Sequence, residues 1–309
     1  MTVAAERSPS RGLLAALSGY LAWGLVPLFW KQLATVDALE LIAQRIFWSL
    51  VFLAPLLAWR GGWAEAKFAV SNPRGFAVNF LSSALLTLNW LVYVWAVNAG
   101  HVIECSLGYF LVPLLNVALG RLVLGEKLRR AQGFAIALAA LGVALELVRL
   151  GHFPWIALTL AASFGTYGLL RKQSPLGPLT GLAVETALLT PFAVGLLLWR
   201  AGHGAGALGH AEPFTQVLVV STGVVTAVPL LLFAYGARRL KLTTLGVLQY
   251  AAPTVQFALG VLVYHEPFSR ERAQAFGLIW TGLAIYTADA IWSARRRNAI
   301  DRSLPTTAG

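Results

Sequence analysis

The sequence predicts an all-α integral membrane protein with ten transmembrane helices, arranged as two inverted five-helix repeats with both termini in the cytoplasm. Three observations lead to this prediction: the composition, an internal duplication, and the distribution of basic residues. The 309-residue chain is 58% hydrophobic and 12% charged, whereas soluble proteins average about 45–50% apolar and 25% charged residues. The composition therefore indicates a chain that resides in a lipid bilayer.

Ten apolar stretches are long enough to cross a membrane, since about 20 helical residues span a hydrocarbon core of roughly 30 Å. They cover residues 13–30, 39–59, 76–97, 102–120, 131–150, 153–170, 178–199, 214–237, 242–264 and 273–292. The first is too long for the apolar region of a cleaved signal peptide, and no small-residue cleavage site follows it. The connections are too short to form soluble domains.

An internal duplication organises these stretches, because residues 101–142 return as residues 241–282. A shift of 140 positions places Pro113 on Pro253, Asn116 on Gln256 and Gly142 on Gly282. Each copy holds five spans, an odd number, so the second copy enters the membrane from the opposite side, as in many secondary transporters. The chain thus divides into an N-terminal tail (1–12), a first repeat (13–150), a second repeat (153–292) and a basic C-terminal tail (293–309).

Basic residues predict the orientation of the chain. The segments on the side of the N-terminus hold 18 of the 24 lysines and arginines, and the segments on the other side hold 5. The positive-inside rule then predicts that both termini are cytoplasmic. Anionic lipid of the inner leaflet accounts for the net charge of +11, so no nucleic-acid partner is expected.

Charged residues within the spans are the first candidates for function, because a charge at mid-membrane costs about 2.5–3.5 kcal/mol on insertion scales. Arg45 and Glu185 occupy equivalent positions in the two copies, and Glu104 enters the membrane from the same side as Arg45. Two interpretations of Arg45 remain open: a structural ion pair with Glu104, or a contact with substrate. Direct pairing of Arg45 with Glu185 is not expected, because inversion separates them along the membrane normal.

Polar and aromatic residues also form stripes at helical spacing on three spans. One face of the fourth span carries Ser106, Tyr109, Pro113 and Asn116, and the matching face of the ninth carries Gly246, Gln249, Pro253 and Gln256. Prolines at mid-helix are expected to kink both helices. The third span places Asn89, Trp90 and Tyr93 near its centre, away from the interfacial belt. These stripes predict the walls of a pocket, and helix packing through small and amide residues is the alternative.

The runs NWLVYVWAVN, SLGYFLVP, SFGTYGLLRK and TTLGVLQYAAPT, together with the duplication, resemble the RarD family of EamA-type permeases in the drug/metabolite transporter superfamily. The resemblance covers residues 12–297 and implies a ten-helix permease of the bacterial inner membrane that moves a small metabolite or drug. It implies functional importance for Trp23, Gly24, Arg45, Asn89, Trp90, Asn98, Glu104, Gly108, Tyr109, Pro113, Asn116, Glu185, Gln249, Tyr250, Pro253, Glu266 and Asp289. One position departs from the family pattern: Gln44 stands where a histidine is common, so no proton relay through that histidine is expected.

We therefore predict a secondary transporter that works by alternating access, with its pocket between the third, fourth, eighth and ninth spans and their symmetry mates. Pro113 and Pro253 are the predicted kinks, and Glu185 or Glu104 would bind a coupling proton. The predicted substrate-binding residues are Arg45, Asn89, Trp90, Tyr93, Glu104, Tyr109, Asn116, Glu185, Gln249, Tyr250 and Gln256. A membrane-embedded enzyme and a passive channel are the alternatives.

Sequence motifs of other functions are weak or missing. Gly204, Gly206 and Gly209 match a dinucleotide-binding pattern but fall in a connection between spans, with no strand before them. The chain lacks GxxxxGK[ST], GxSxG and HExxH, and its five histidines form no ligand cluster in the sequence. We expect no cofactor, no metal and no enzymatic activity. The expected partners are a small-molecule substrate, the lipid bilayer and a coupling proton, while the patterns do not specify the substrate, the direction of transport or the oligomeric state.

Overall fold

The computed structural model describes residues 9–99, 101–263 and 270–303, and within them it contains twelve helices and no strand. The helices are α1 (Pro9–Lys31), α2 (Ala38–Trp59), α3 (Trp63–Ser71), α4 (Pro73–Asn98), α5 (Val102–Leu122), α6 (Arg130–Leu150), α7 (Trp155–Gln173), α8 (Pro178–Gly202), α9 (Pro213–Ala237), α10 (Leu242–Gln249), α11 (Ala251–Leu262) and α12 (Arg270–Ser303). The all-helical prediction is confirmed for these residues.

Eight of the helices are long and apolar enough to cross a membrane: α1, α2, α4, α5, α6, α8, α9 and α12. The remaining two expected spans coincide with α7 and with the α10–α11 pair. Helix α7 contacts α4, α5, α9 and α10 and buries most of its residues, so protein covers much of the surface that lipid would otherwise face. A membrane helix that is surrounded by other helices can carry polar residues on the faces that contact protein, so it can be less apolar than a helix that faces lipid.

The expected ninth span, 242–264, is interrupted. Helix α10 ends at Gln249 and α11 begins at Ala251, with a turn at Tyr250. Pro253 explains the position of the break, since proline lacks a backbone N–H and its ring collides with the carbonyl four residues earlier, which is that of Gln249. Helix α5, by contrast, runs through Pro113 without interruption.

Helix α3 was not expected, because its residues lie in what the sequence indicates to be a connection. It is nine residues long, and Trp63 and Phe68 are exposed on it beside Lys67. Exposed aromatic side chains next to a basic residue are typical of short helices that lie in the membrane interface.

The distribution of side chains is that of a membrane protein. Large apolar side chains such as Phe192 and Val217 are exposed on the outer surface of the bundle, whereas polar side chains such as Asn79, Ser82 and Thr222 are buried. Lipid can cover the first group, and internal hydrogen bonds satisfy the second. We conclude that the chain is a multi-pass membrane protein.

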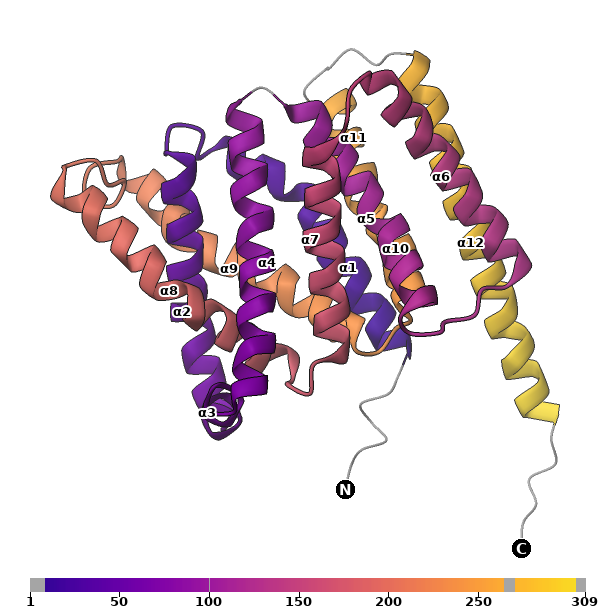
Figure 1. The fold of residues 1–309 in the computed structure, drawn as a ribbon, viewed down its shortest axis with the longest axis horizontal. Helices are drawn as coiled ribbons and strands as arrows, with labels where there is room; N and C mark the ends of the chain where they lie inside the picture. The colour runs from indigo at the N-terminus through magenta and orange to yellow at the C-terminus, as the bar shows by residue number, and fades with distance from the viewer. Residues whose placement is uncertain (1–8, 100, 264–269, 304–309) are drawn as a thin grey trace, which may run out of the picture.

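Figure 1 shows helices that run alternately up and down, so that α1 begins and α12 ends on the lower side of the view. Helix α3 and the connections α5–α6, α7–α8 and α9–α10 lie on the same lower side. These segments carry most of the basic residues that the sequence assigns to the cytoplasm.

Helices at equivalent positions of the two halves pack against each other, namely α2 with α8, α5 with α10, and α6 with α12. The α6–α12 contact is reciprocal. A Cβ atom on Gly142 would lie 2.7 Å from the carbonyl oxygen of Ala275, and one on Gly282 would collide with the carbonyl of Ala135. Gly142 and Gly282 are 140 positions apart, as are Ala135 and Ala275, so each half offers the other the same surface.

Candidate functional site

A cavity of about 160 Å³ lies at the centre of the bundle, between the two halves of the chain. Its walls come from α1, α2, α4, α5, α7, α9, α10 and α11. The lining residues are Tyr20, Trp23, Val26, Pro27, Trp30, Arg45, Asn89, Trp90, Tyr93, Tyr109, Phe164, Leu230, Gln249, Ala252, Pro253 and Gln256. Most of these side chains are aromatic or carry an amide, and Arg45 is the one charged residue among them.

Helix α1 contributes one whole face to the cavity. Tyr20, Trp23, Pro27 and Trp30 recur at intervals of three and four residues, which places them on one side of a helix. Gly24 allows this helix to approach α11 closely, since a Cβ atom there would lie 2.6 Å from Cβ of Val255.

Arg45 reaches the cavity from α2. Its Nε donates a 3.1 Å hydrogen bond to Thr226 Oγ1. The guanidinium carbon lies 4.1 Å from the ring centroid of Trp90 and 5.2 Å from that of Trp30. Cation–π contacts of desolvated groups contribute about 2 kcal/mol, a magnitude similar to the cost of placing an arginine in a membrane helix.

The pairing of Arg45 with Glu104 that the sequence left open is wrong. Glu104 lies at the upper end of α5 with its Oε1 3.3 Å from His101 Nδ1 and 3.7 Å from His152 Nε2. It is buried and does not line the cavity. Arg45 has Thr226 and two indole rings as neighbours instead, because α2 packs against α9.

Three amide side chains contribute polar groups to the cavity. Asn89 Nδ2 donates to the carbonyl of Leu160 and to Ser163 Oγ, both at 3.0 Å. Gln256 Nε2 donates to the carbonyl of Trp23 at 3.2 Å, and Gln249 Oε1 accepts from Asn116 Nδ2 at 3.1 Å. Each amide is thus anchored at one atom, and the other atom remains available to a bound molecule.

The contact of α5 with α10 holds one wall of the cavity in place. A Cβ atom on Gly246 would lie 2.6 Å from the carbonyl oxygen of Pro113 and 2.9 Å from Cβ of Asn116. Asn116 itself is buried behind Gln249 and positions its amide. The two predicted stripes therefore face each other, but of their residues only Tyr109, Gln249, Pro253 and Gln256 line the cavity.

Aromatic side chains close the cavity toward the lower side. Helix α1 rises from that side and α7 and α9 descend toward it (Figure 1), so within each helix Tyr20 comes nearer the lower end than Trp30, Tyr167 than Phe164, and Phe233 than Leu230. The ring of Phe233 lies 6.1 Å from Tyr20, 5.8 Å from Trp23, 5.5 Å from Phe164 and 6.1 Å from Tyr167.

Below this aromatic layer, Glu126 of the first half contacts the second half, and Lys172 and Arg238 connect segments within the second half. Glu126 accepts hydrogen bonds from the backbone N–H of Leu242 at 2.7 Å and of Thr243 at 2.9 Å, and so caps the start of α10. Lys172 donates to the carbonyls of Ala237 and Leu240, and Arg238 donates to that of Leu176.

Glu185 lies outside the cavity in a buried network between α4, α7 and α8. Its carboxylate accepts from Ser82 Oγ at 2.5 Å and from Tyr167 Oη at 3.3 Å, and Arg171 Nη1 lies 3.4 Å away. Both charged side chains are 1% exposed. The sequence pattern places Arg171 in a connection between spans, so this partner was not expected. A void of about 10 Å³ lies beside Glu185 and also touches Trp90 and Leu230 of the cavity wall.

Tyr250 also lies outside the cavity. Its hydroxyl donates to the carbonyl of Phe110 at 3.2 Å, and its ring packs with Phe110 against α6 and α12. Seven of the eleven predicted binding residues thus line the cavity: Arg45, Asn89, Trp90, Tyr93, Tyr109, Gln249 and Gln256. The other four, Glu104, Asn116, Glu185 and Tyr250, do not.

Several residues at notable positions were not among the predicted binding residues. Tyr20, Trp30 and Phe164 line the cavity, and the three-to-four spacing of aromatic residues on α1 was the signal that could have found the first two. Gln44, where the resemblance implies a histidine, accepts from Trp48 Nε1 at 3.0 Å. Asp289, within α12, accepts from Arg129 at the start of α6 and does not line the cavity. The side chain of Asn98 and all of Glu266 lie outside the described residues.

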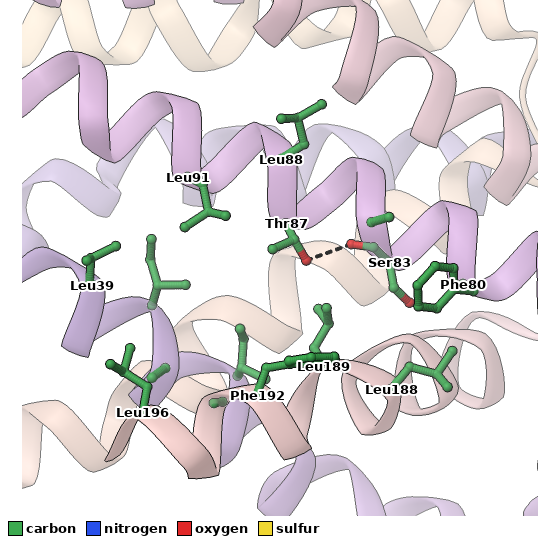
Figure 2. A pocket seen from close by; sticks show the side chains of 15 residues that line it. Leu39, Phe80, Ser83, Thr87, Leu88, Leu91, Leu188, Leu189, Phe192 and Leu196 are labelled. Carbon is green, nitrogen blue, oxygen red and sulfur yellow. Dashed lines mark hydrogen bonds between the residues drawn. The ribbon is translucent and has the colours of Figure 1, made fainter. Parts of the chain in front are cut away.

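A second, larger space of about 450 Å³ opens between α2, α4 and α8 (Figure 2). Leu39, Phe80, Leu88 and Phe192 line it and are exposed. Thr87 donates its hydroxyl proton to the carbonyl of Ser83, and Ser83 does so to that of Asn79. The groove therefore offers an apolar surface of the kind that lipid chains cover, and the central cavity is the candidate site.

Comparisons with known proteins agree with this architecture. The profile of the EamA-like transporter family matches residues 10–148 and 154–288. "Protein RarD" of Streptomyces exfoliatus is 45% identical over 310 residues, which covers 98% of this chain and 96% of the relative. "Protein RarD" of Escherichia coli (strain K12) is 40% identical over 286 residues, with coverage of 93% and 97%.

A solved crystal structure supports the fold. It has a TM-score of 0.69 at 22% identity and covers 91% of this chain and 98% of its own. The chain belongs to the EamA-like transporter family and, within it, to the proteins named RarD.

Proposed function

We propose that this protein is a secondary transporter that moves a small metabolite or drug across the bacterial inner membrane by alternating access through the central cavity. The observation that carries the proposal is the composition of the cavity wall, which uses equivalent positions of both halves. Trp90 and Leu230 are 140 positions apart, as are Tyr109 and Gln249, and all four line the cavity. Substrate sites of many secondary transporters lie at such a repeat interface.

Ten spans in two inverted repeats are part of the proposal. Helices in equivalent positions run in opposite directions in Figure 1, as α4 and α9 illustrate. The reciprocal contacts of Gly142 with Ala275 and of Gly282 with Ala135 are those expected for halves related by a two-fold axis. The two segments matched by the family profile support the division into repeats at residues 13–150 and 153–292.

Cytoplasmic termini follow from the basic connections, which lie on the side where α1 begins and α12 ends. In this orientation the aromatic layer and the contacts of Glu126 with the start of α10 form the inner gate, and the cavity lies nearer the outside. Alternating access then requires these contacts to break while the upper ends of the helices close.

Proton coupling through Glu185 is a further part of the proposal. Thr226 connects the two regions, because it accepts from Arg45 and also lines the 10 Å³ void beside Glu185. That volume is near the minimum for one water molecule. Glu104, the other candidate, is separated from the cavity and pairs with histidines.

The alternatives fit the cavity less well. Its described lining residues offer arginine, tyrosine and amide groups but no nucleophile beside a base, and relatives of the chain are named transporters. A passive channel would need a continuous polar path, whereas Tyr20, Tyr167 and Phe233 close the lower side.

Single cysteines test alternating access directly. In a Cys105→Ala background, one cysteine replaces Val26 of the cavity wall and, in a separate variant, one replaces Ala16, which is buried below the aromatic layer. An impermeant maleimide applied from each side reports accessibility. The solute is identified by comparing cells that lack the protein with cells that overproduce it. Its addition should raise the maleimide reactivity of one of the two cysteines and lower that of the other. Simultaneous reaction of both sites from one side would support a channel instead.

Transport and coupling are then measured in proteoliposomes. Counterflow of the identified solute is expected, driven uptake should respond to a pH gradient, and Glu185→Gln should abolish that response while counterflow persists. Glu104→Gln serves as the comparison and should keep the response. An unaffected response in Glu185→Gln would remove the coupling role of this residue.

A further inference from the structure

The central cavity carries a positive charge without a protein counter-charge. No ion pair among the described residues includes Arg45. The buried carboxylates of neighbouring helices are each engaged elsewhere: Glu40 with Arg200, Glu104 with two histidines and Glu185 with Arg171. Arg45 is also the one charged residue of the lining. A partly buried guanidinium in this state favours a ligand that brings a negative charge.

The geometry of Arg45 leaves its terminal nitrogens available. Its hydrogen bond within the described structure uses Nε, which Thr226 holds, and the rings of Trp90 and Trp30 pack against the guanidinium. The planar group is thereby oriented, and neither Nη1 nor Nη2 has a hydrogen-bond partner among the described residues. Two parallel N–H groups of an arginine match the two oxygens of a carboxylate.

Other groups of the cavity add further donors, although Asn89 and Gln256 leave their amide oxygens available as acceptors. The hydroxyls of Tyr20, Tyr93 and Tyr109 make no hydrogen bond within the described part of the chain, and that of Tyr20 is buried. Gln249 keeps its Nε2 available, since its Oε1 accepts from Asn116. Unsatisfied buried donors are unfavourable, and the oxygens of an anion would satisfy them.

The remaining wall is mainly aromatic and apolar. Trp23, Trp30, Trp90 and Phe164 line the cavity, and aromatic side chains of this kind suit contact with an aromatic ring. The volume of about 160 Å³ is below the roughly 300–1,000 Å³ of pockets for drug-sized ligands, so the cavity in this conformation suits one ring with a short substituent.

We propose that the substrate class of the central cavity is a small organic monocarboxylate with a planar aromatic ring, bound through Arg45. This inference rests on the proposed function, because it assumes that the cavity is the transport site. A zwitterion or a cation should bind less well, because the cavity wall holds no carboxylate to pair with an ammonium group.

Isothermal titration calorimetry on the purified full-length protein in nanodiscs tests the class with matched probes. Phenylacetate and phenylacetamide have the same shape and differ in charge, 2-phenylethylamine reverses the charge, and cyclohexylacetate keeps the charge but lacks the aromatic ring. We expect phenylacetate to bind at least about tenfold more tightly than phenylacetamide or 2-phenylethylamine, as one charge-assisted hydrogen-bond pair allows, and more tightly than cyclohexylacetate.

Variants separate the role of Arg45 from a general effect of charge. Arg45→Gln should abolish the preference for phenylacetate over phenylacetamide, and Arg45→Lys should retain part of it. Arg149→Gln, which removes an exposed arginine paired with Glu146 outside the cavity, should leave it unchanged. Equal binding of phenylacetate and phenylacetamide, a preference that survives in Arg45→Gln, or no binding of phenylacetate up to about 10 mM would overturn the proposal. Cyclohexylacetate binding as tightly as phenylacetate would overturn its aromatic part.

This equilibrium measurement needs no gradient and no transport. Failure of the probes to discriminate would remove the substrate class and leave the cysteine and counterflow tests of transport untouched. Conversely, phenylacetate binding without any change in the maleimide accessibility of the single cysteines would contradict the transport role but support the binding site.

Discussion

The hydroxyl of Tyr250 donates a 3.2 Å hydrogen bond to the carbonyl oxygen of Phe110, and the two residues occupy equivalent positions of the two halves. Their rings are also stacked, with centroids 6.5 Å apart. Residues that contact their own equivalents lie near an axis that relates the halves. Tyr250 therefore belongs to the contact between α5 and the α10–α11 pair, one layer behind the cavity.

Tyr250→Phe should lower the stability of the protein and leave transport largely intact. The substitution keeps the ring and removes one buried hydrogen bond, which contributes about 0.5–1.5 kcal/mol. Chemical denaturation in detergent measures the change in the free energy of unfolding. Loss of transport at unchanged stability would contradict a structural role and would support the original prediction that Tyr250 binds substrate.

Gly246→Ala should destabilise the protein because the added methyl group meets the carbonyl of Pro113 at 2.6 Å and Cβ of Asn116 at 2.9 Å. Overpacking of this kind typically costs about 1–3 kcal/mol. Gly195→Ala is the matched control, since it is also a helical glycine and nothing lies within 4 Å of the place that its new methyl group would take. The control should be neutral or stabilising by up to about 1 kcal/mol. Equal effects in denaturation experiments would show that the α5–α10 contact is not close.

Glu126→Gln should weaken the cap of α10. The carboxylate accepts two backbone N–H bonds and one from Thr243 Oγ1 at 2.8 Å, and such charge-assisted bonds at a helix start contribute about 1–2 kcal/mol. We expect a loss of that size in the free energy of unfolding, measured at low and high salt. Glu146→Gln, which breaks an exposed pair with Arg149, should cost under about 1 kcal/mol. A smaller loss in Glu126→Gln than in Glu146→Gln would argue against the cap.

Arg171→Leu should be strongly destabilising, because it leaves the carboxylate of Glu185 buried without its cation. Breaking one side of a buried pair costs about 3–5 kcal/mol, whereas replacing both partners is often neutral. The double variant with Glu185→Leu should therefore be more stable than Arg171→Leu alone, as a double-mutant cycle in denaturant can measure. Arg129→Leu at the more exposed pair with Asp289 provides the comparison and should have a smaller effect. If the changes in the free energy of unfolding for Arg171→Leu and Glu185→Leu simply add in the double variant, the two side chains do not stabilise each other.

Sequence alone determined the membrane class, the helical class, and the general location of eight spans, because a bilayer forces each crossing segment to be a long apolar helix that satisfies its own backbone. It also identified Arg45, Trp90, Tyr109 and Gln249 as candidates, since polar groups at mid-membrane favour the protein interior and these aromatic residues lie away from the interfacial belt. Each of these conclusions can be drawn from the residues of a single helix, without knowledge of how the helices pack.

Only the tertiary structure decided which polar groups meet. Glu185 pairs with Arg171 and Tyr250 with Phe110, whereas Glu104 pairs with histidines, because these contacts depend on how helices distant in sequence cross and rotate against each other. The uncompensated charge of Arg45 likewise emerges from packing, whereas the break at Tyr250 follows from the nearby Pro253. A helical pattern specifies which face is polar, but the partner of that face is set by the helix that lies opposite it.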